Sequence, residues 1–397
     1  MCGDPALFMA GLVVRPRARI LHGHDWVYAT EVLKTFGDPQ DGDVVSVKDG
    51  RDKLLGTAIY NSSSQIVARR ISRRRQDLDR DFFVRRLSLA QSWRERAGCD
   101  LTLCRLIWSE ADGLPGVIAD RYGDVVVLQT LTKAMDGAKQ VIAECLADLP
   151  GVAHVVERND AAVRALERLP AVSGCLVGAD PGERIIELAG AKFRVNFLSG
   201  HKTGLYLDQA DNYQAVAGHA RGLRVLDCFS NQGGFALTCA LGGASSVTAI
   251  ESGAEAAARL KENAALNVVT VDVLQEDVFD VLPRLAKREE KFDLVILDPP
   301  SFTKAKGKIH EALRGYEDLH RLATPLLAPN AMLATFCCSH HVSQEAFLGA
   351  IAAGFSQGRK SAHVIAALGQ PMDHPVALHL PETAYLKGFL LVARPSF

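Results

Sequence analysis

The sequence lacks the patterns that define several large classes of protein. Its 397 residues include nine cysteines but no C-x-x-C pair, and the odd number argues against a disulfide framework. Cysteine usage therefore favours a reducing compartment, and we expect a cytoplasmic protein without a metal site. No 18 uncharged apolar residues run together, and the N-terminus has neither a long apolar core nor a convincing cleavage site. We expect no membrane association and no secretion.

An excess of either charge is also missing. The chain has 45 Lys and Arg residues against 46 Asp and Glu residues, which gives a formal net charge of -1. Any binding of nucleic acid must therefore rely on local basic patches. Internal repeats and low-complexity tracts do not stand out. With 48% hydrophobic residues, the chain is long enough for two or three domains with cores of their own.

Short β-like runs and turn signals fill the segment from Leu12 to Ile71. Runs such as 43–47 and 66–68 alternate with Asp-Gly and Asn-Ser turns, which predicts a small β-barrel. Arginines lie at both ends of this segment, and a closed barrel would bring them together as a phosphate-binding surface. A solvated linker without such a role is the alternative. The arginines are Arg15, Arg17, Arg19, Arg69, Arg70, Arg73, Arg74 and Arg75.

A middle block follows, in which strand-like and helical patterns alternate. Residues 77–97 look like one amphipathic helix. From Asp100 to about Gly190, strands are predicted at 125–128 and 152–156, with a helix at 138–146 between them. The acidic, glycine-rich stretch Glu110–Gly116 has the composition of a turn. A substrate-facing loop is the functional alternative for this stretch.

The third block begins near Phe193 and contains the evidence for a cofactor. Residues 224–235 predict a strand with Asp227 at its tip, a glycine-containing loop and a helix. A dinucleotide fold carries GxGxxG there and binds a pyrophosphate, which Asp227 would repel. S-adenosylmethionine has a cationic sulfonium and no phosphate, so it suits a carboxylate at this point. We expect Phe229 and Gly233 of the loop to contact it, with a nicotinamide dehydrogenase as the main alternative.

Acidic residues also follow the next two predicted strands. Strand 246–250 leads to Glu251, 24 positions after Asp227, where a carboxylate accepts from both ribose hydroxyls. Asp277 follows a third strand and would accept from the adenine amino group, with Val278 or Phe279 against the ring. Carboxylates at helix starts are commonly N-caps, so each acid alone is weak evidence. The ordered set of acids predicts S-adenosylmethionine.

A fourth predicted strand, 294–297, leads into Asp298-Pro299-Pro300-Ser301-Phe302. The two prolines remove two backbone donors and leave carbonyl groups at the strand tip free to accept from an amino group. About 40 residues later, the strand 331–336 delivers Cys337 and Cys338 to what should be the same edge of the sheet. We predict that Cys338 attacks the substrate and Asp298 holds it, whereas Cys337 is a buried apolar residue.

Six motifs spread over nearly the whole chain resemble the RlmI-type family of bacterial 23S ribosomal RNA cytosine-5 methyltransferases. They are His24–Tyr28, Ser109–Gly116, Gly200–Gln209, Asp373–Pro375, Pro381-Glu382 and Tyr385–Gly388. The resemblance implies an N-terminal PUA RNA-binding domain, a class I methyltransferase domain and 23S rRNA as partner, with S-adenosylhomocysteine as a product. A homodimer is expected on the resemblance alone.

The resemblance also implies roles for single residues. Asp227, Glu251, Asp277 and Asp298 would contribute to cofactor binding, and Lys202, Tyr206 and Gln209 would lie near the cofactor. The family arginine after the Asp-Gln pair is Ala210 here, so its contact is absent or supplied elsewhere. The family Ser-Cys-Ser motif is Cys337-Cys338-Ser339, which aligns Cys338 with the family cysteine. Ser301 stands where many RNA cytosine methyltransferases have a second cysteine, and His340 and His341 are interpreted as loop residues or proton-transfer groups.

The sequence therefore predicts an α/β protein with three domains. A PUA-type β-barrel is expected at 1–75, a linker helix with a small central α+β domain at 76–190, and a Rossmann-like class I methyltransferase domain with a mostly parallel sheet at 191–397. The expected function is formation of 5-methylcytosine in 23S rRNA through a covalent adduct of Cys338 with C6 of the base. Two alternatives stay open: methylation of a purine nitrogen in rRNA without a covalent step, and a non-catalytic RNA-binding or assembly factor.

Overall fold

The computed structural model describes residues 10–198, 204–303 and 306–395. Contacts divide the described chain into two compact units, which are treated separately below. The first unit holds the described residues up to 183 together with 196–198, 204–205 and 372–383. The second holds 184–195, the described part of 206–371, and 384–395. The three domain ranges expected from the sequence remain predictions.

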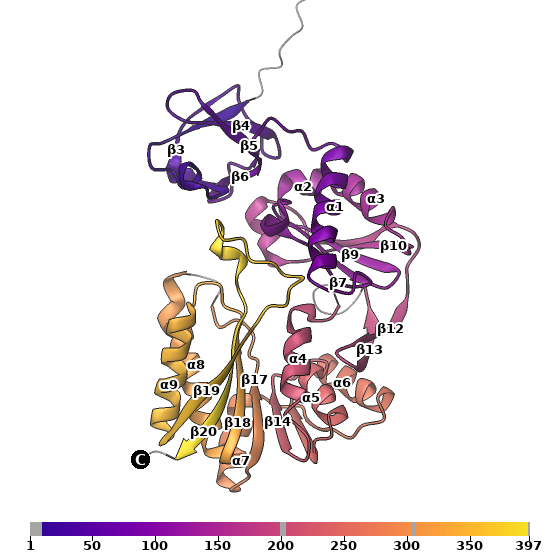
Figure 1. Ribbon diagram of the computed structural model, residues 1–397, viewed down its shortest axis with the longest axis vertical. Coiled ribbons are helices and arrows are strands. Elements are labelled where there is room, and N and C mark those ends of the chain that lie inside the picture. The colour runs from indigo at the N-terminus through magenta and orange to yellow at the C-terminus, as the bar shows by residue number, and fades with distance from the viewer. Residues whose placement is uncertain (1–9, 199–203, 304–305, 396–397) are drawn as a thin grey trace, which may run out of the picture. The chain divides into compact units, whose positions relative to one another are not determined.

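The N-terminal part of the first unit is a six-stranded sheet in the order β2-β6-β5-β4-β1-β3. Buried side chains from the other five strands meet in one cluster, which includes Leu12, Val27, Val45 and Val67, and Val32 of the edge strand β3 packs against it. The sheet therefore curls around its own core, as the ribbon shows (Figure 1). The strands are β1 (Gly11–Val14), β2 (Trp26–Tyr28), β3 (Val32–Phe36), β4 (Val44–Lys48), β5 (Leu54–Tyr60) and β6 (Ile66–Ser72).

The register of this sheet decides where the arginines lie. Strand β1 runs parallel to β4, with Val13 opposite Lys48, while β5 runs antiparallel to both β4 and β6. The end of β1, the end of β4, the start of β5 and the end of β6 therefore share one end of the sheet. Residues 15–17 and 73–75 follow β1 and β6 at that shared end. This placement agrees with the expectation that the fold brings both arginine groups to one side.

The predicted amphipathic helix is α1 (Arg80–Arg96), and it begins where the Asp79 side chain accepts from the Phe82 amide at 2.7 Å. It packs on a five-stranded sheet in the order β11-β10-β9-β8-β7, in which only β9 and β10 are parallel. Helix α3 covers this sheet as well, and both helices contribute to one buried cluster. The elements are β7 (Leu103–Trp108), β8 (Val117–Tyr122), β9 (Val125–Thr130), α2 (Lys133–Gly137), α3 (Lys139–Ala147), β10 (His154–Asn159) and β11 (Val172–Val177).

Segment 372–383, although late in the chain, belongs to the first unit and ties two family-like motifs into it. The buried guanidinium of Arg94 forms an ion pair with Asp112 and donates to the carbonyl of Asp373 at 2.8 Å. Asp373 in turn accepts from the amide of Arg105 at 2.8 Å. Farther along the segment, His24 lies 3.3 Å from Glu382. Asp373 and Glu382 of the two motifs therefore link segment 372–383 to distant parts of the first unit.

The second unit is built on a seven-stranded sheet in the order β16-β15-β14-β17-β18-β20-β19. Strands β14 to β18 are parallel to one another, and β20 is antiparallel to both β18 and β19. The expected Rossmann-like, mostly parallel sheet is therefore confirmed. The strands are β14 (Arg224–Cys228), β15 (Ser246–Ile250), β16 (Asp272–Leu274), β17 (Phe292–Leu297), β18 (Leu327–Cys337), β19 (Lys360–Gly369) and β20 (Lys387–Pro395).

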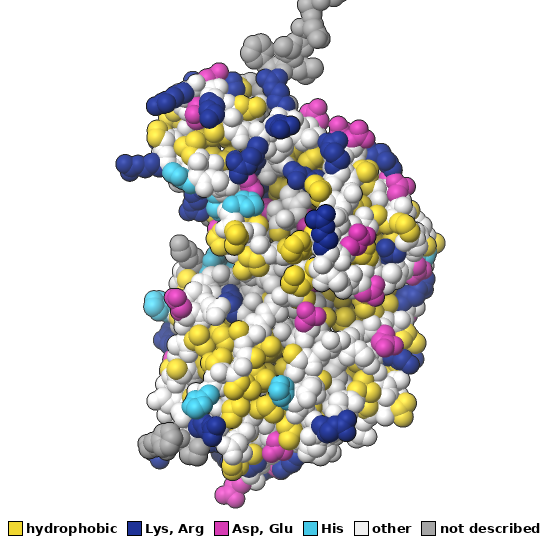
Figure 2. Space-filling model, in the orientation of Figure 1, with side chains coloured by type: hydrophobic (Ala, Val, Ile, Leu, Met, Phe, Trp, Pro, Cys, Tyr) yellow, Lys and Arg dark blue, Asp and Glu magenta, His cyan; other side chains and the backbone are white. Residues whose placement is uncertain are grey.

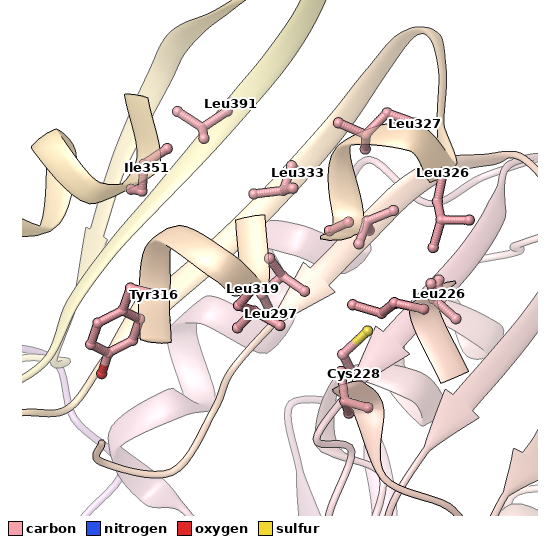
Figure 3. Packing of buried hydrophobic residues seen from close by; sticks show 14 of the residues in the cluster. Leu226, Cys228, Leu297, Tyr316, Leu319, Leu326, Leu327, Leu333, Ile351 and Leu391 are labelled. Carbon is pink, nitrogen blue, oxygen red and sulfur yellow. The ribbon is translucent and has the colours of Figure 1, made fainter. Parts of the chain in front are cut away.

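Helices cover both faces of this sheet. On one face, side chains from α7, α8 and α9 pack against Leu226, Leu297 and Leu333 in a large buried cluster, part of which is drawn in Figure 3. On the other face, Phe235 of α5 stacks on Phe336 at 5.2 Å between ring centroids. The helices are α4 (Ala210–Ala217), α5 (Gly234–Leu241), α6 (Ala254–Leu266), α7 (Val278–Lys287), α8 (Ile309–Ala323) and α9 (Gln344–Gln357), and the hairpin of β12 (Glu183–Leu188) and β13 (Ala191–Asn196) lies against α6.

Within the described ranges, no helix is long and apolar enough to cross a membrane.

Candidate active site

The predicted site residues of the second unit converge at one edge of its sheet. Strands β14 to β18 are parallel neighbours, so their carboxyl ends lie side by side. Chain order reverses between β14 and β17, and ligands of open α/β sheets bind at such a switch point. Asp227, Glu251, Asp277, Asp298 and Cys338 all stand at or just after these strand ends. The topology therefore brings these strand tips to one edge of the sheet, and their joint contact with one ligand stays a prediction.

Asp227 is the most deeply buried of the acids, with a residue exposure of 1%. Its Oδ2 accepts from the amide of Ala236 in the first turn of α5 at 3.0 Å, while its buried Oδ1 has no hydrogen-bond partner among the described residues. Burial raises the pKa of Asp227 to about 8, and the negative charges of Asp298 and Glu251 contribute to the same shift. A buried acceptor without a donor is rare and indicates a place where a ligand supplies one.

The loop after β14 has a strained backbone. Phe229 and Asn231 have positive φ angles of 64° and 49°, a backbone conformation that residues other than glycine seldom adopt. Glu251 stabilises this loop, because its Oε2 accepts a hydrogen bond from the Asn231 amide at 2.8 Å. Its Oε1 accepts from the amide of Gly253, two residues further along the chain, at 2.7 Å. Carboxylate oxygens have further lone pairs, so Glu251 retains acceptor capacity for hydroxyl groups. Strain of this kind clusters at binding sites.

Asp277 acts as the N-cap of α7, with its Oδ1 accepting from the amide of Phe279 at 2.7 Å. The side chain is exposed, so its second oxygen faces solvent. Val278 is only 2% exposed and belongs to the core, whereas Phe279 is half-buried. Phe279 has ring contacts with Phe229 at 6.4 Å and with Phe302 at 6.3 Å between centroids. Of the two residues expected against an adenine ring, Phe279 is therefore the one with accessible apolar surface.

Asp298 receives a hydrogen bond from Gln209, whose Nε2 lies 3.0 Å from Oδ2 of the carboxylate. Gln209 is buried and is held in turn by Asn212, whose Nδ2 donates to Oε1 at 2.6 Å. Burial raises the pKa of Tyr206, and the negative charges of Asp298 and Asp208 add to this shift. Tyr206 and Gln209 were expected near the cofactor by resemblance, and the structure places Gln209 against Asp298. Ala210, which replaces the family arginine, is the first residue of α4.

Cys338 stands immediately after β18, between two fully buried residues. Cys337 is 0% exposed and belongs to the core, which confirms its predicted role as an apolar residue. Ser339 is also 0% exposed, and its hydroxyl lies 2.9 Å from that of Ser301 and 3.2 Å from that of Tyr316. Cys338 itself is half-buried, with Sγ 3.9 Å from the carbonyl oxygen of Pro299. The two neighbours hold the thiol at the tip of β18, beside the turn that follows Asp298 at the tip of β17.

Lys387 of β20 is a residue at this site that the sequence did not single out. It lies opposite Cys337 in the antiparallel pairing of β18 and β20, and its Nζ donates to the carbonyls of Ser339 and Val342 at 2.8 Å each. Burial lowers the pKa of Lys387, while charges at Cys337 and Cys338 would raise it. The lysine therefore fixes the loop that follows Cys338. Its place within a family-like motif was the available signal, but motif membership alone names no contact.

The residues of this site that remain are Gly233, Lys202, His340 and His341. Gly233 is the N-cap of α5 with a φ of 94°, and a Cβ there would meet Leu260 and Leu237 at 3.0 and 3.1 Å. Lys202 lies outside the described residues. His340 stacks on Tyr385 at 5.5 Å, and His341 is exposed.

The predicted RNA-binding arginines of the first unit divide by accessibility. Arg15, Arg17, Arg19, Arg73, Arg74 and Arg75 are exposed, although Arg19 lies over the ring of Tyr28 at 4.3 Å. Figure 2 shows Lys and Arg side chains spread over the N-terminal domain in this view. Arg70 is 6% exposed and paired with Asp25, and Arg69 is paired with Glu110. Including these two in a phosphate-binding surface was wrong, because their charges serve internal ion pairs.

The strand-tip residues fit a ligand with a cationic centre and several hydroxyl donors. Asp227 offers an unpartnered buried oxygen, Glu251 and Asp277 offer further acceptors, and Phe229 and Phe279 offer ring surface. A bound cation would stabilise the charged form of Asp227, whose burial otherwise favours the neutral acid. S-adenosylmethionine has these features.

Two family models match the chain. A model of S-adenosylmethionine-dependent methyltransferases matches residues 118–391, and a model of PUA-like domains matches residues 15–73. The second match covers most of the curled N-terminal sheet, and the first covers the whole candidate active site.

Curated relatives match nearly the full length. A ribosomal RNA large subunit methyltransferase I from Aeromonas hydrophila is 37% identical over 94% of this chain and 96% of the relative. A protein of the same name from Vibrio vulnificus is 38% identical over 93% and 95%. Among solved structures, SMU.776 complexed with SAH superposes with a TM-score of 0.83 at 23% identity, covering 96% of this chain and 99% of that chain. This last likeness shows the shared fold.

Proposed function

The chain belongs to the S-adenosylmethionine-dependent methyltransferase family, within the group of ribosomal RNA large subunit methyltransferase I proteins, and on this basis we propose that it forms 5-methylcytosine in 23S ribosomal RNA. Its methyl donor is S-adenosylmethionine, which, when bound, supplies an electrophilic methyl group. The relatives' names support large-subunit rRNA as the substrate. The choice of cytosine C5 is our own proposal.

Four strand tips would hold the cofactor. Asp227 would face a positive charge, since its buried Oδ1 lacks a donor and its neutral form is favoured only while no cation is near. Glu251 would accept from ribose hydroxyls with the lone pairs that the loop amides leave open. Asp277 would accept from the adenine amino group, with Phe279 against the ring. Gln209 would orient Asp298 between cofactor and substrate.

Cytosine C5 is a poor nucleophile until a group adds to C6. In the proposed reaction, the thiolate of Cys338 adds to C6, a new S–C6 bond forms, and the ring electron pair moves to C5. C5 would then take the methyl group as its bond to the sulfonium sulfur breaks, which leaves the thioether S-adenosylhomocysteine. A general base removes the C5 proton, the C5–C6 double bond re-forms and the thiolate leaves. Asp298 would donate to or hold N3 as charge develops there, which a carboxyl group in a partly buried site is suited to do.

One observation supports this chemistry more than any other. Cys338 Sγ lies 3.9 Å from the carbonyl oxygen of Pro299, the residue next to Asp298, so a thiol and a carboxyl group border the same small region. Two buried neighbours and Lys387 hold the segment in place. A nucleophile needs such fixed geometry toward its substrate.

The test is transfer of labelled methyl from S-adenosylmethionine to 23S rRNA, with the product nucleoside identified by mass. We expect 5-methylcytidine from the unmodified protein and a loss of at least about a thousandfold in rate with Cys338→Ala, because covalent activation is removed. Cys337→Ala is the matched control. Its side chain is in the core, so rate should change little.

Two results would contradict the proposal. A methylated purine as product, or undiminished rate with Cys338→Ala, would assign the protein to nitrogen methylation without a covalent step. Absence of labelling together with tight RNA binding would favour a non-catalytic factor.

A further inference from the structure

The first unit contains a cleft of about 620 Å³ that no predicted site accounts for. Its walls come from five separate parts of the chain: Asp25, the end of β6 with Arg73, the middle of α1, the turn Glu110–Gly113, and residues near 375–379. The turn was predicted from its composition, with a substrate-facing loop as the alternative. In the structure Ser109–Asp112 is a short 3-10 helix, Glu110 accepts from the indole nitrogen of Trp26, and the stretch lines the cleft.

The lining holds three arginines and three carboxylates, but two of the carboxylates are paired with arginines outside the lining. Its three carboxylates are all engaged: Asp25 with Arg70 and His379, Glu110 with Arg69, and Asp112 with Arg94. Two further lining guanidinium groups, those of Arg73 and Arg86, have no carboxylate partner among the residues that the structure describes. The cleft therefore has an uncompensated positive charge from two arginines.

Arg86 is held in a defined position. One of its terminal nitrogens donates to the carbonyl oxygen of Ile71, and its guanidinium lies over the ring of Phe82 at 5.4 Å. A Cβ on Gly113 would meet the guanidinium carbon at 2.9 Å, which shows how closely the turn packs against it. Burial lowers the pKa of Arg86, and the charge of Asp25 raises it. A positioned, partly dehydrated guanidinium is well suited to bind phosphate.

Exposed apolar side chains lie beside these arginines. Leu89 and Trp93, four residues apart on α1, both line the cleft and are 63% and 43% exposed. The indole nitrogen of Trp93 donates to the carbonyl of Met372 at 3.3 Å, which restrains the ring. An exposed, restrained aromatic ring next to phosphate-binding groups is the arrangement on which single-stranded nucleic acid stacks its bases.

We propose that this cleft binds a single-stranded segment of the RNA substrate, with a backbone phosphate at Arg86 and Arg73 and a base stacked on Trp93. The inference rests on the proposed function in that the ligand is the RNA to be methylated. The cleft extends the predicted arginine surface, because Arg73 belongs to the surface and to the cleft. The bound RNA would run from the end of β6 toward α1. A protein partner is less suitable, since the apolar surface is small and the free charge is positive.

The experiment measures binding of the full chain to a fluorescein-labelled, mixed-sequence single-stranded RNA of about 12 nucleotides by anisotropy, without cofactor. Arg73→Gln and Arg86→Gln should each weaken binding severalfold and lower the slope of log K against log salt by about 0.7. Trp93→Ala should weaken binding roughly tenfold, and Trp93→Phe should retain most of it. Trp93 is one of three tryptophans, so quenching of its emission by RNA offers a second signal.

Arg85→Gln is the matched control, since Arg85 is on the same helix, is exposed and contacts Gln76 outside the cleft. Arg73→Gln cannot act through misfolding, because the side chain is exposed and has no packing role. Equal losses with Arg85→Gln, or a Trp93→Ala protein that binds normally, would overturn the proposal. So would competition by inorganic phosphate at low millimolar concentration, which would mark a small-anion site.

Binding and turnover separate this inference from the proposed function. If the cleft binds RNA but no 5-methylcytidine forms, the proposed RNA-binding cleft is supported and the proposed methylation reaction is contradicted. If methyl transfer proceeds and these variants leave the KM for 23S rRNA unchanged, the proposed RNA-binding cleft is contradicted and the proposed methylation reaction is supported. With both correct, the variants raise KM and leave kcat nearly unchanged.

Discussion

Asp227 shows at the scale of one residue how burial prepares a site for its ligand. The carboxyl group is 1% exposed, accepts one backbone hydrogen bond and leaves Oδ1 without a donor. With a pKa of about 8, it is mostly neutral at pH 7 when no ligand is present. A cationic ligand favours the charged form, so binding must release a proton.

The affinity for S-adenosylmethionine should therefore rise with pH. Between pH 6 and 8 we expect roughly a tens-fold increase, which flattens above pH 8, together with proton release near pH 7. Asp227→Asn should bind weakly and lose most of this dependence. Isothermal titration calorimetry in buffers of different ionisation enthalpy measures both quantities. A pH dependence that is the same in the variant would assign the titration to another group.

Stability of the ligand-free protein should change in the opposite direction. The pKa of Asp227 is raised on folding from 3.8 to about 8, so the unfolded chain ionises more readily and stability falls as pH rises from about 4 to 8. One pKa unit corresponds to about 1.4 kcal/mol, which sets an upper limit of about 6 kcal/mol on this loss. Chemical unfolding at pH 5 and pH 8 should show a smaller difference for Asp227→Asn than for the unmodified protein.

At the scale of elements, the packing of α8 against α9 explains why two glycines of one helix should respond differently to substitution. They pack together on one face of the second unit's sheet, where α9 contains both Gly349 and Gly354. A Cβ on Gly354 would lie 2.6 Å from the carbonyl oxygen of Glu317 and 2.6 Å from Cβ of His320. Nothing lies within 4 Å of the corresponding position at Gly349.

The two glycines therefore form a matched pair of mutations. Gly354→Ala should destabilise the protein by about 1–3 kcal/mol, because backbone must move to admit a methyl group. Gly349→Ala should stabilise it by about 0.5–1 kcal/mol, because alanine has the higher helix propensity. Urea unfolding of both variants measures the difference. Equal effects would mean that α8 and α9 are not packed as closely at Gly354 as the structure has them.

At the scale of the whole molecule, binding of a large RNA must depend on a few surfaces, since the net charge is only -1. Arg17, Arg74 and Arg75 are exposed and follow strands that end at the same end of the N-terminal sheet. No described carboxylate is paired with any of the three side chains.

Replacing Arg17, Arg74 and Arg75 together with Gln should weaken RNA binding and reduce its salt dependence. Each lost phosphate contact lowers the slope of log K against log salt by about 0.7, so the triple variant should lose up to about 2. A salt series of anisotropy titrations provides the slope. Lys34→Gln, in the middle of edge strand β3, is the control that should leave it unchanged. An unchanged slope in the triple variant would remove these arginines from the RNA-binding surface.

The sequence by itself determined those features that depend on neighbours along the chain. Period and turn composition predicted α1, the strand 246–250 and the mostly parallel sheet, because helices and strands are stabilised by local spacing of apolar residues. The acids Asp227, Glu251 and Asp298 could be placed at one edge for the same reason, since every βαβ unit returns its next strand tip to that edge. The burial of Cys337 followed from its place in an apolar strand.

Only the tertiary structure decided how distant side chains pair. The sequence does not distinguish Arg69 and Arg70 from Arg73, Arg74 and Arg75. In the structure Arg69 forms an ion pair with Glu110, and Arg70 forms one with Asp25. The partners Gln209 with Asp298, and Lys387 with the carbonyl of Ser339, are separated by 89 and 48 positions. Local patterns carry no information about such pairings, because they depend on which elements the completed fold brings together. The cleft at Arg86 and Trp93 exists for the same reason, since five segments remote from one another in the chain form its walls.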